Sequence, residues 1–331
     1  MLTLALLLLA ADPAAGASQT YGDWAVACDN LAICEMTSLM GEGDWPEDGP
    51  LAASIRRAPG PQGGFEITVD SAKATDNVAL RIDGKPVAQG VPKDGAVRFG
   101  GAEAARIVAA LIEGSALTLA NARGTIATIS LKGSSAALRF IDAGQGRAGT
   151  VTAAAAKGAK PAASVPAGPA VPRIAALRSG GTPATVSAVL RKQMEKAAGC
   201  DEDLAESDKE SAVQTFALGG GATLALLPCG SGAYNINSVP FVVRGGKAAV
   251  ADMDYSGDGS GEAAMLTNAW WDAKTSVLGT HAKGRGIGDC GESASYVWNG
   301  KGFRLIELRS MGECRGSINW LRTWKAEPVY R

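Results

Sequence analysis

Residues 281–291 combine two cationic side chains with alternating glycines. The segment reads His-Ala-Lys-Gly-Arg-Gly-Ile-Gly-Asp-Cys-Gly, so Lys283 and Arg285 are each followed by a glycine. Glycines at alternate positions allow backbone N–H groups to turn inward as a nest, and the two cations add positive charge. The pattern predicts binding of a carboxylate, a phosphate or an acidic protein side chain, with Tyr234 and Asn235 as further ligand-binding residues. The alternative is a disulfide-anchored loop whose glycines serve backbone geometry alone.

His281 is the single histidine of the chain, so any Ser-His-Asp or Cys-His mechanism would have to use it. A hydrolase using His281 with Asp289 or Asp254 is therefore an alternative function. The sequence lacks a G-x-S-x-G elbow, and the 281–291 segment lacks the G-x-x-x-x-G-K-[ST] order of a P-loop. We assign no catalytic residue.

Asp252, Asp254 and Asp258 resemble the first half of a calcium loop, with oxygen donors at alternate positions and Gly257 at the sixth. The twelfth position is Ala263, so the bidentate carboxylate of such a loop is missing. We interpret the segment as a polar turn and predict no metal and no cofactor.

The cysteines are six in number, which in an exported chain favours disulfides over thiols. They show no C-x-x-C spacing, and one histidine leaves little for a Cys/His zinc site. Six cysteines allow fifteen pairings in principle. We predict the local ones: Cys28 with Cys34, Cys200 with Cys229, and Cys290 with Cys314.

The N-terminus predicts export. An apolar run over 2–11 is followed by Ala15-Gly16-Ala17, a small-x-small cleavage site. The run is too short to span a bilayer, so we expect a signal peptide over 1–17, a periplasmic or secreted protein, and no integral membrane segment in the mature chain.

Composition excludes some functions. The 331 residues carry 32 Lys+Arg against 33 Asp+Glu, a net charge of -1, which provides no basic field for nucleic acid. Glycine accounts for 43 residues, so a turn-rich protein is expected. The length fits roughly two domains.

Residues 143–182 predict a flexible linker, because alanine, glycine, proline and lysine dominate and large apolar residues are almost absent. Such a segment buries too little surface to offset its ordering entropy. It divides the chain into an N-terminal β domain over 18–142 and a C-terminal β-meander domain over 183–331.

The N-terminal domain is expected to be a small antiparallel β structure with one packed helix. Strands are predicted over 21–28, 33–40, 51–58, 65–70, 78–82, 96–99, 117–120, 125–131 and 137–141. The helix is indicated by apolar residues at helical spacing before Gly114, namely Ala104, Ile107, Val108, Leu111 and Ile112.

The C-terminal domain is expected to begin with a helix from Pro183 to Gly199, capped by Thr182, with Val186, Val189, Leu190, Met194 and Ala197 on one face. Lys247, Lys274 and Lys301 then follow at intervals of 27 residues (274 − 247 and 301 − 274), each after a small residue. We interpret them as hairpin turns and predict a meander of about eight antiparallel strands.

The opposite end of this meander is the candidate binding face. Its connections are long and glycine-rich, over 228–238, 254–262, 282–292 and 310–316, and three of the four contain a cysteine. Loops held by a rigid scaffold are where function usually resides. The adjacent Trp270 and Trp271 should point to opposite faces of a strand, so at least one of them can lie outside the core.

Several motifs together resemble a known family: Gly22-Asp23-Trp24 with Cys28 and Cys34, residues 129–133 leading to 137–139 and 145–147, residues 232–235, 283–291 around Cys290, and 314–316 with Trp320 and Trp324. The chain resembles uncharacterised secreted proteobacterial proteins defined by a domain of unknown function, and is more distantly similar to invasion-associated locus B proteins. The resemblance implies a protein of the cell envelope, and it carries over no catalytic residue.

These inferences lead to a hypothesis of non-enzymatic binding of an envelope protein or an anionic ligand. Lys283, Arg285, Tyr234 and Asn235 are its contact residues. Besides the hydrolase, an inhibitor of a cell-wall hydrolase is a further alternative.

Overall fold

Antiparallel strands dominate the molecule, which confirms the mainly β class. The computed structural model describes residues 16–41, 52–70, 74–200, 212–232, 234–254 and 264–331. The expected signal peptide therefore falls almost wholly outside the described residues. None of the described helices is long and apolar enough to cross a membrane.

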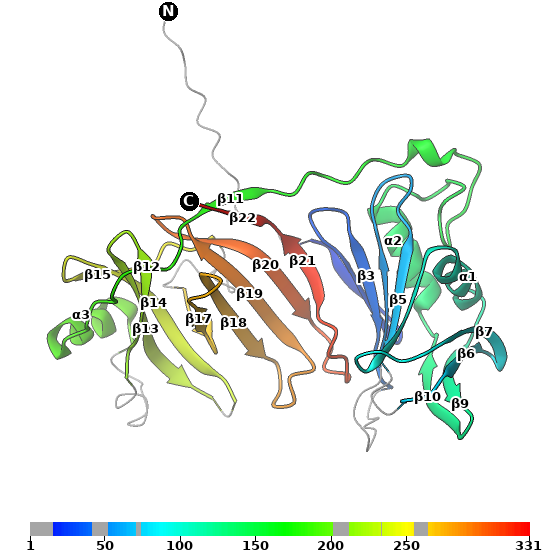
Figure 1. The fold of residues 1–331 in the computed structure, drawn as a ribbon, viewed down its shortest axis with the longest axis horizontal. Helices are drawn as coiled ribbons and strands as arrows, with labels where there is room; N and C mark the ends of the chain where they lie inside the picture. The colour runs from blue at the N-terminus through cyan, green and yellow to red at the C-terminus, as the bar shows by residue number, and fades with distance from the viewer. Residues whose placement is uncertain (1–15, 42–51, 71–73, 201–211, 233, 255–263) are drawn as a thin grey trace, which may run out of the picture.

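The N-terminal half contains ten strands and two α-helices within the described residues (Figure 1). They are β1 (Ser18–Tyr21), β2 (Trp24–Cys28), β3 (Cys34–Ser38), β4 (Ala53–Arg57), β5 (Phe65–Asp70), β6 (Val78–Ile82), β7 (Lys85–Gly90), β8 (Ala96–Gly100), α1 (Gly101–Leu111), β9 (Ala116–Asn121), β10 (Gly124–Ser130) and α2 (Ser134–Gly144). One sheet has the order β1-β2-β3-β4-β5-β8 and the other the order β10-β9-β6-β7.

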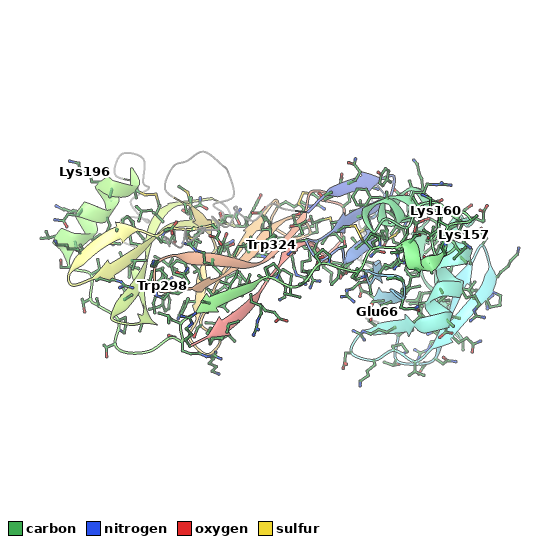
Figure 2. All side chains as sticks on the ribbon, turned by 90° about the horizontal axis from the view of Figure 1, so that it is seen from above. Glu66, Lys157, Lys160, Lys196, Trp298 and Trp324 are labelled. Atoms are coloured by element: carbon green, nitrogen blue, oxygen red, sulfur yellow. A yellow bond between two sulfur atoms is a disulfide. The ribbon has the colours of Figure 1, made fainter. Side chains whose placement is uncertain are left out.

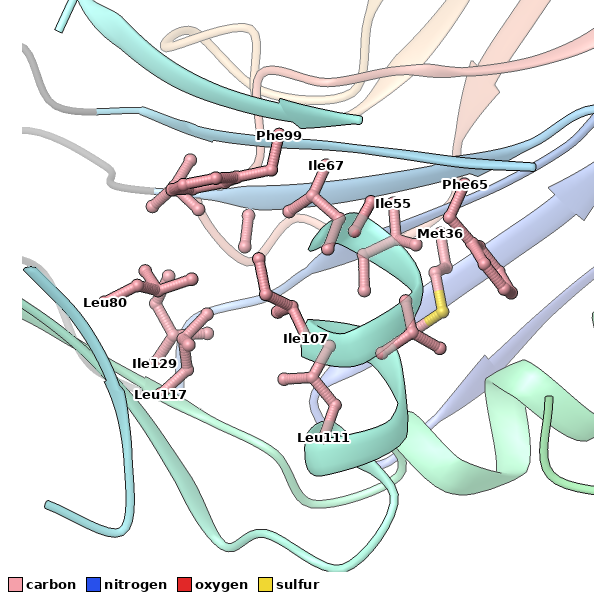
Figure 3. Close-up of a cluster of buried hydrophobic side chains, with 14 of the residues drawn as sticks. Met36, Ile55, Phe65, Ile67, Leu80, Phe99, Ile107, Leu111, Leu117 and Ile129 are labelled. Atoms are coloured by element: carbon pink, nitrogen blue, oxygen red, sulfur yellow. The ribbon is translucent and has the colours of Figure 1, made fainter. Parts of the chain in front are cut away.

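The predicted packed helix is confirmed as α1, which lies between these two sheets. Ala104, Ile107, Val108 and Leu111 are all buried. Ile107 and Leu111 meet Ile55 and Ile67 of one sheet and Leu80, Leu117 and Ile129 of the other in a single core cluster (Figure 3).

Helix α2 corrects the strand predicted over 137–141. Ala137, Leu138 and Ile141 are fully buried. They fit one face of a helix at i, i+1 and i+4, whereas alternation along a strand would have separated Ala137 from Leu138. Gly133 precedes the helix with a φ of 95°, a conformation that favours glycine.

Part of the expected linker is folded. Thr150, Ala153 and Ala154 are buried, and Arg147 has no exposed surface. Hydrogen bonds, and not burial of a large apolar surface, fix the position of this segment. The Asp142 carboxylate accepts hydrogen bonds from the backbone N–H groups of residues 154–156. The chain then crosses to the C-terminal half (Figure 1).

Among its described residues, the C-terminal half contains two five-stranded antiparallel sheets, with β16 beside β14 in the first, and a parallel pair of β11 and β22. The short 3-10 helix η1 (Ala162–Ser164) lies beside the N-terminal half, before the chain crosses. The elements of the C-terminal half are β11 (Arg173–Ala176), α3 (Ala188–Ala198), β12 (Gln214–Gly219), β13 (Ala222–Ser231), β14 (Ile236–Arg244), β15 (Lys247–Val250), β16 (Leu266–Thr267), β17 (Trp270–Asp272), β18 (Val277–Lys283), β19 (Gly291–Trp298), β20 (Phe303–Met311), β21 (Leu321–Lys325) and β22 (Glu327–Tyr330).

The 27-residue spacing marks hairpin turns. Lys247 begins β15 after a Gly-Gly turn, and Lys274 and Lys301 lie in the turns from β17 to β18 and from β19 to β20. The meander divides into the sheets β12–β16 and β17–β21, so it is not one continuous sheet.

Helix α3 is shorter than predicted. It begins after Ser187, whose side chain accepts a hydrogen bond from the Leu190 N–H, and it ends at Gly199 in the left-handed conformation. Leu190 and Met194 are buried as predicted, but Val189 is 69% exposed and Ala197 is exposed, so the buried face of the helix is narrower than predicted.

All three predicted disulfides are confirmed: Cys28–Cys34, Cys200–Cys229 and Cys290–Cys314. The six cysteines all lie in the described residues, and none is free.

The two halves meet along β21, which packs against β2 and β3. A small apolar cluster joins them through Ala25, Ala27, Leu39, Met311 and Trp320, among others. The molecule is elongated, with Trp298 and Trp324 in the C-terminal half and Glu66 and Lys157 in the N-terminal half (Figure 2).

Candidate functional site

Three of the four predicted ligand-binding residues come together at one end of the C-terminal sheets. The Asn235 side chain donates from Nδ2 to the Lys283 carbonyl at 2.9 Å and accepts the Lys283 N–H at 3.2 Å. Tyr234 Oη donates to the Gly284 carbonyl at 3.2 Å. We call the surface formed by residues 234–236 and 281–291 the loop-end face.

Asn268 braces this face from a third segment. Its Nδ2 lies 2.9 Å from both Asn235 Oδ1 and the His281 carbonyl, and its Oδ1 accepts the Ile236 N–H at 2.9 Å. The loops are therefore tied to each other by side-chain hydrogen bonds.

Arg285, the fourth predicted residue, is engaged inside the loop. Its Nε donates to Asp289 Oδ1 at 2.7 Å, and the buried Asp289 also accepts the Gly316 N–H at 2.7 Å. The hydrogen bond from Arg285 holds the pKa of Asp289 below its ordinary value. Arg285 thus stabilises the loop conformation beside the Cys290–Cys314 disulfide.

The glycines of the loop serve mainly its own geometry. The Gly284 N–H donates to the Cys290 carbonyl and the Gly288 N–H donates to the Arg285 carbonyl, so neither is available to an anion. Lys283 is the cation that remains, because no ion pair of its ammonium group is found within the described part of the chain.

His281 stacks on Trp320, with ring centroids 4.4 Å apart and an interplanar angle of 9°. Burial, and secondly the charge of Lys283, lower its pKa. The proposed acidic partners are bound elsewhere: Asp289 by Arg285, and Asp254 by Arg304 Nη1 at 3.1 Å and by the Leu305 N–H. This geometry favours a packing role for His281 over the hydrolase alternative.

A pocket of about 330 Å³ adjoins the loop-end face, between the two halves of the chain. It is lined by Glu35, His281, Gly288, Ser293, Arg309, Ile318, Asn319 and Trp320. His281, Ser293 and Arg309 are register partners across β18, β19 and β20, whereas Glu35 comes from β3. Burial raises the pKa of Glu35, although the charges of Arg309, Arg56 and Arg322 oppose the shift.

Sequence reasoning missed Glu35, Ser293, Arg309 and Asn319. Ser293 is paired with His281 on one neighbouring strand and with Arg309 on the other, so the three side chains lie on one face of the sheet. The strand register of the predicted meander is therefore the signal that could have identified Ser293 and Arg309. No local sequence pattern could have predicted that Glu35 lines this pocket. Glu35 lies 274 residues before Arg309 and reaches the pocket only because the two halves pack together.

The predicted calcium-like turn holds an arginine. Asp252 Oδ2 and Asp254 Oδ1 contact Arg304 at 2.6 and 3.1 Å, while Asp258 lies outside the described residues. Across the described residues no group of three or more His, Cys, Asp or Glu side chains is placed to hold a metal ion.

The adjacent tryptophans behave as alternation requires. Trp271 is buried in the core, and Trp270 is 48% exposed on the opposite face, with its indole over Gly279. Trp298 and Trp320 are buried as well, so these two serve packing.

Comparison with known proteins identifies relatives along the whole chain. Uncharacterized protein YpfG of Escherichia coli (strain K12) is 29% identical over 335 residues, which covers 94% of this chain and 93% of that protein. The crystal structure of invasion associated protein b from Bartonella henselae is similar at a TM-score of 0.28 and 21% identity, over 38% of this chain and 96% of that one. The family model described as "Protein of unknown function (DUF1176)" matches residues 18–327. The chain therefore belongs to this family of proteins of unknown function.

Proposed function

We propose that the protein is a non-enzymatic binding module of the cell envelope, which recognises an acidic partner or anionic ligand through its loop-end face. The observation that carries this proposal is the reciprocal pair of hydrogen bonds between the Asn235 side chain and the Lys283 backbone. A surface whose loops are already ordered loses less conformational entropy on binding than a mobile one.

Electrostatics supports the choice of an acidic partner. Lys283 offers an ammonium group at this face, while Arg285 is paired with Asp289. Apolar surface lies beside the charge, because Tyr234 is 41% and Ile287 is 53% exposed. Exposed aromatic side chains are enriched in protein-binding surfaces, and a cation beside them favours an acidic partner through complementary charge.

The three disulfides support placement in the periplasm or outside the cell. Disulfides persist in oxidising compartments and are rare where glutathione and thioredoxin keep thiols reduced. All six cysteines are paired in the structure.

The test compares Lys283→Glu with Lys274→Glu. Lys274 is an exposed lysine in the turn from β17 to β18, away from the loop-end face, so both variants change the net charge equally. Each biotinylated protein is incubated with a solubilised envelope fraction, and the retained components are quantified by mass spectrometry. We expect Lys274→Glu to behave as wild type and Lys283→Glu to lose about tenfold or more of the specific component.

Equal retention by the two variants would contradict the proposal. Arg285 is unsuitable for this test, since its removal leaves the buried Asp289 carboxylate without its ion pair. Titration of the purified protein against a lysozyme separates general binding from the alternative of a cell-wall hydrolase inhibitor, because only the inhibitor reduces turnover.

A further inference from the structure

A second pocket lies in the N-terminal half, between α1 and the segment after α2, far along the chain from the loop-end face. Its volume is about 320 Å³. One wall is apolar and includes Phe65, Val108 and Ile112. The charged residues that line it are Arg57, Arg147 and Lys157, and no Asp or Glu is found among the described lining residues. A pocket with three cations and an apolar wall is unexpected in a chain whose net charge is -1.

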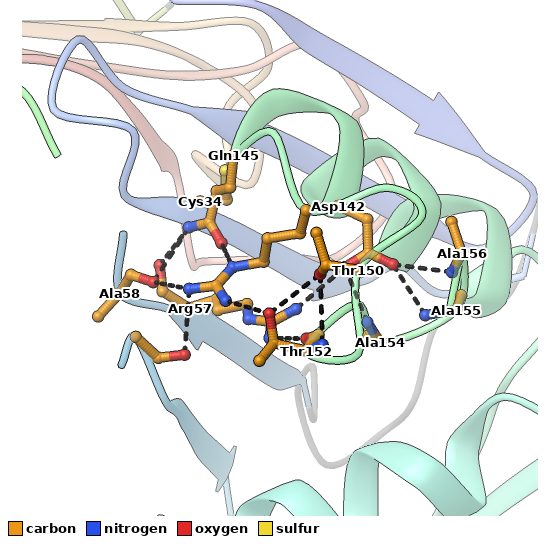
Figure 4. Close-up of polar contacts among 12 residues, drawn as sticks. Cys34, Arg57, Ala58, Asp142, Gln145, Thr150, Thr152, Ala154, Ala155 and Ala156 are labelled. Atoms are coloured by element: carbon orange, nitrogen blue, oxygen red, sulfur yellow. Dashed lines mark hydrogen bonds and ion pairs between the residues drawn. The ribbon is translucent and has the colours of Figure 1, made fainter. Parts of the chain in front are cut away.

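The two arginines are buried, and one buried carboxylate, that of Asp142, pairs with Arg57. Arg57 is 4% exposed, and Arg147 and Asp142 have no exposed surface. Arg57 Nη1 donates to Asp142 Oδ1 at 3.0 Å, as the polar network in Figure 4 shows. The Asp142 carboxylate also accepts hydrogen bonds from the backbone N–H groups of residues 154–156.

Arg147 is hydrogen-bonded to neutral acceptors. Its Nε donates to Gln145 Oε1 at 2.8 Å, its Nη1 to Thr152 Oγ1 at 3.2 Å, and its Nη2 to the carbonyls of residues 58, 60 and 63. These acceptors orient the guanidinium without neutralising it. The buried cluster therefore contains two cations and one anion, an excess of one positive charge.

Arg57 is the cation that remains incompletely satisfied. Its Nε has no hydrogen-bond partner among the described residues. Burial, together with repulsion from Arg147, lowers the pKa of Arg57 to about 10, so the side chain stays charged at neutral pH. An uncompensated charge in a low-dielectric interior is unfavourable, and an anion in the adjoining pocket would relieve it.

We propose that this pocket binds a small organic carboxylate with an apolar body. The carboxylate would lie on the side of Lys157 and Arg57, whose Cζ lies 4.3 Å from the centroid of the Phe65 ring, and the body against Val108 and Ile112 of α1. The size of the pocket falls at the lower end of the range of known small-molecule sites. This site is independent of the loop-end face, so failure of either proposal leaves the other standing.

Octanoate is the probe for the test, because it combines a carboxylate with an apolar chain. Two matched ligands separate its parts: 1-octanol has the chain without the charge, and inorganic phosphate has the charge without the chain. Binding to the full mature chain is followed by NMR, through the methyl resonances of Val108 and Ile112. We expect saturable shifts with octanoate, at an affinity at least about tenfold above that for either control ligand.

Substitution of Arg57 could unfold the protein, because it would leave Asp142 without its ion pair. The site is therefore blocked by Ala109→Trp, on an exposed position of α1 that lines the pocket. The matched control is Ala122→Trp, an exposed position in the turn from β9 to β10 that does not line it. We expect Ala109→Trp to weaken octanoate binding about tenfold or more and Ala122→Trp to leave it unchanged.

Four results would overturn the proposal. They are the absence of saturable octanoate binding, equal binding of 1-octanol, equal binding of phosphate, and octanoate binding to Ala109→Trp with the affinity of the wild type.

Discussion

Arg315 of the C-terminal half forms an ion pair with Asp23 of the N-terminal half, although the two residues are 292 positions apart in the chain. The same guanidinium donates from Nε to the Met40 carbonyl and from Nη1 to the Gly22 carbonyl, each at 2.8 Å. One side chain therefore links the hairpin of β2 and β3 to the segment that precedes β21. The pocket containing Glu35 is likewise lined by residues of both halves.

Arg315→Ala is expected to loosen the junction and to reduce the free energy of unfolding by about 2–3 kcal/mol, because charge-assisted hydrogen bonds to partly buried acceptors are lost. Urea denaturation measures the change, and small-angle X-ray scattering measures any separation of the halves. Arg56→Ala is the control, since the Arg56–Glu66 pair is exposed and such pairs contribute about 0.5 kcal/mol or less. Equal effects of the two substitutions would refute the linking role.

Asp142→Asn is expected to destabilise the protein by about 3–5 kcal/mol, because it leaves the buried Arg57 without its carboxylate. The control is Asp76→Asn, which removes an exposed ion pair with Arg123 and should cost about 0.5 kcal/mol or less. Both values come from urea denaturation at neutral pH. A small effect at Asp142 would show that the network around it is not essential for folding.

The stabilisation by Asp289 is expected to depend on pH. Its pKa lies below the ordinary value of 3.8, first because Arg285 donates a hydrogen bond to its carboxylate. A lowered pKa means that ionised Asp289 stabilises the fold fully above the unfolded pKa and loses this effect as the pH falls through the folded pKa. The difference in unfolding free energy between wild type and Asp289→Asn should therefore be constant above about pH 5 and shrink below about pH 4.

Urea denaturation across this pH range tests the prediction for Asp289. A difference for Asp289→Asn that stays constant down to about pH 2 would contradict the assignment.

Gly279 is expected to tolerate a side chain only when Trp270 is absent. A methyl group at position 279 would overlap the Trp270 indole, which lies across this glycine from the neighbouring strand. Gly279→Ala should cost about 1–3 kcal/mol in the wild type and much less in a Trp270→Ala background. A double-mutant cycle by thermal denaturation measures the coupling, and additive effects of the two substitutions would disprove the contact.

Much of the secondary structure follows from local pattern. Helix α1 was predicted because Ile107, Val108 and Leu111 recur at helical spacing before a glycine, and β5 and β6 because apolar residues alternate. Helix α2 was missed because the short apolar run 137–141 fits either period, and burial of Leu138 beside Ala137 decided for the helix.

The candidate site was predicted only in part. Asn235 and Lys283 do meet, since the register of the meander brings their loops to one end. The ion pair of Arg285 with Asp289 could not be predicted from spacing, because it depends on how the loop closes. The pocket of Arg57 and Arg147 was not foreseen, because residues 145–157 were expected to remain flexible.

The mainly β class and the hairpin turns follow from the sequence alone, because an alternating strand or a glycine turn depends on residues close together in the chain. The sequence also favours the local disulfide pairs among fifteen possible sets, since the paired cysteines are at most 29 positions apart. The pairing of charges depends on the packing of the chain, since Arg57 and Asp142, or Glu35 and Arg309, become neighbours only when distant segments meet. The charge of a buried group depends on its neighbours in space, and local spacing does not encode these.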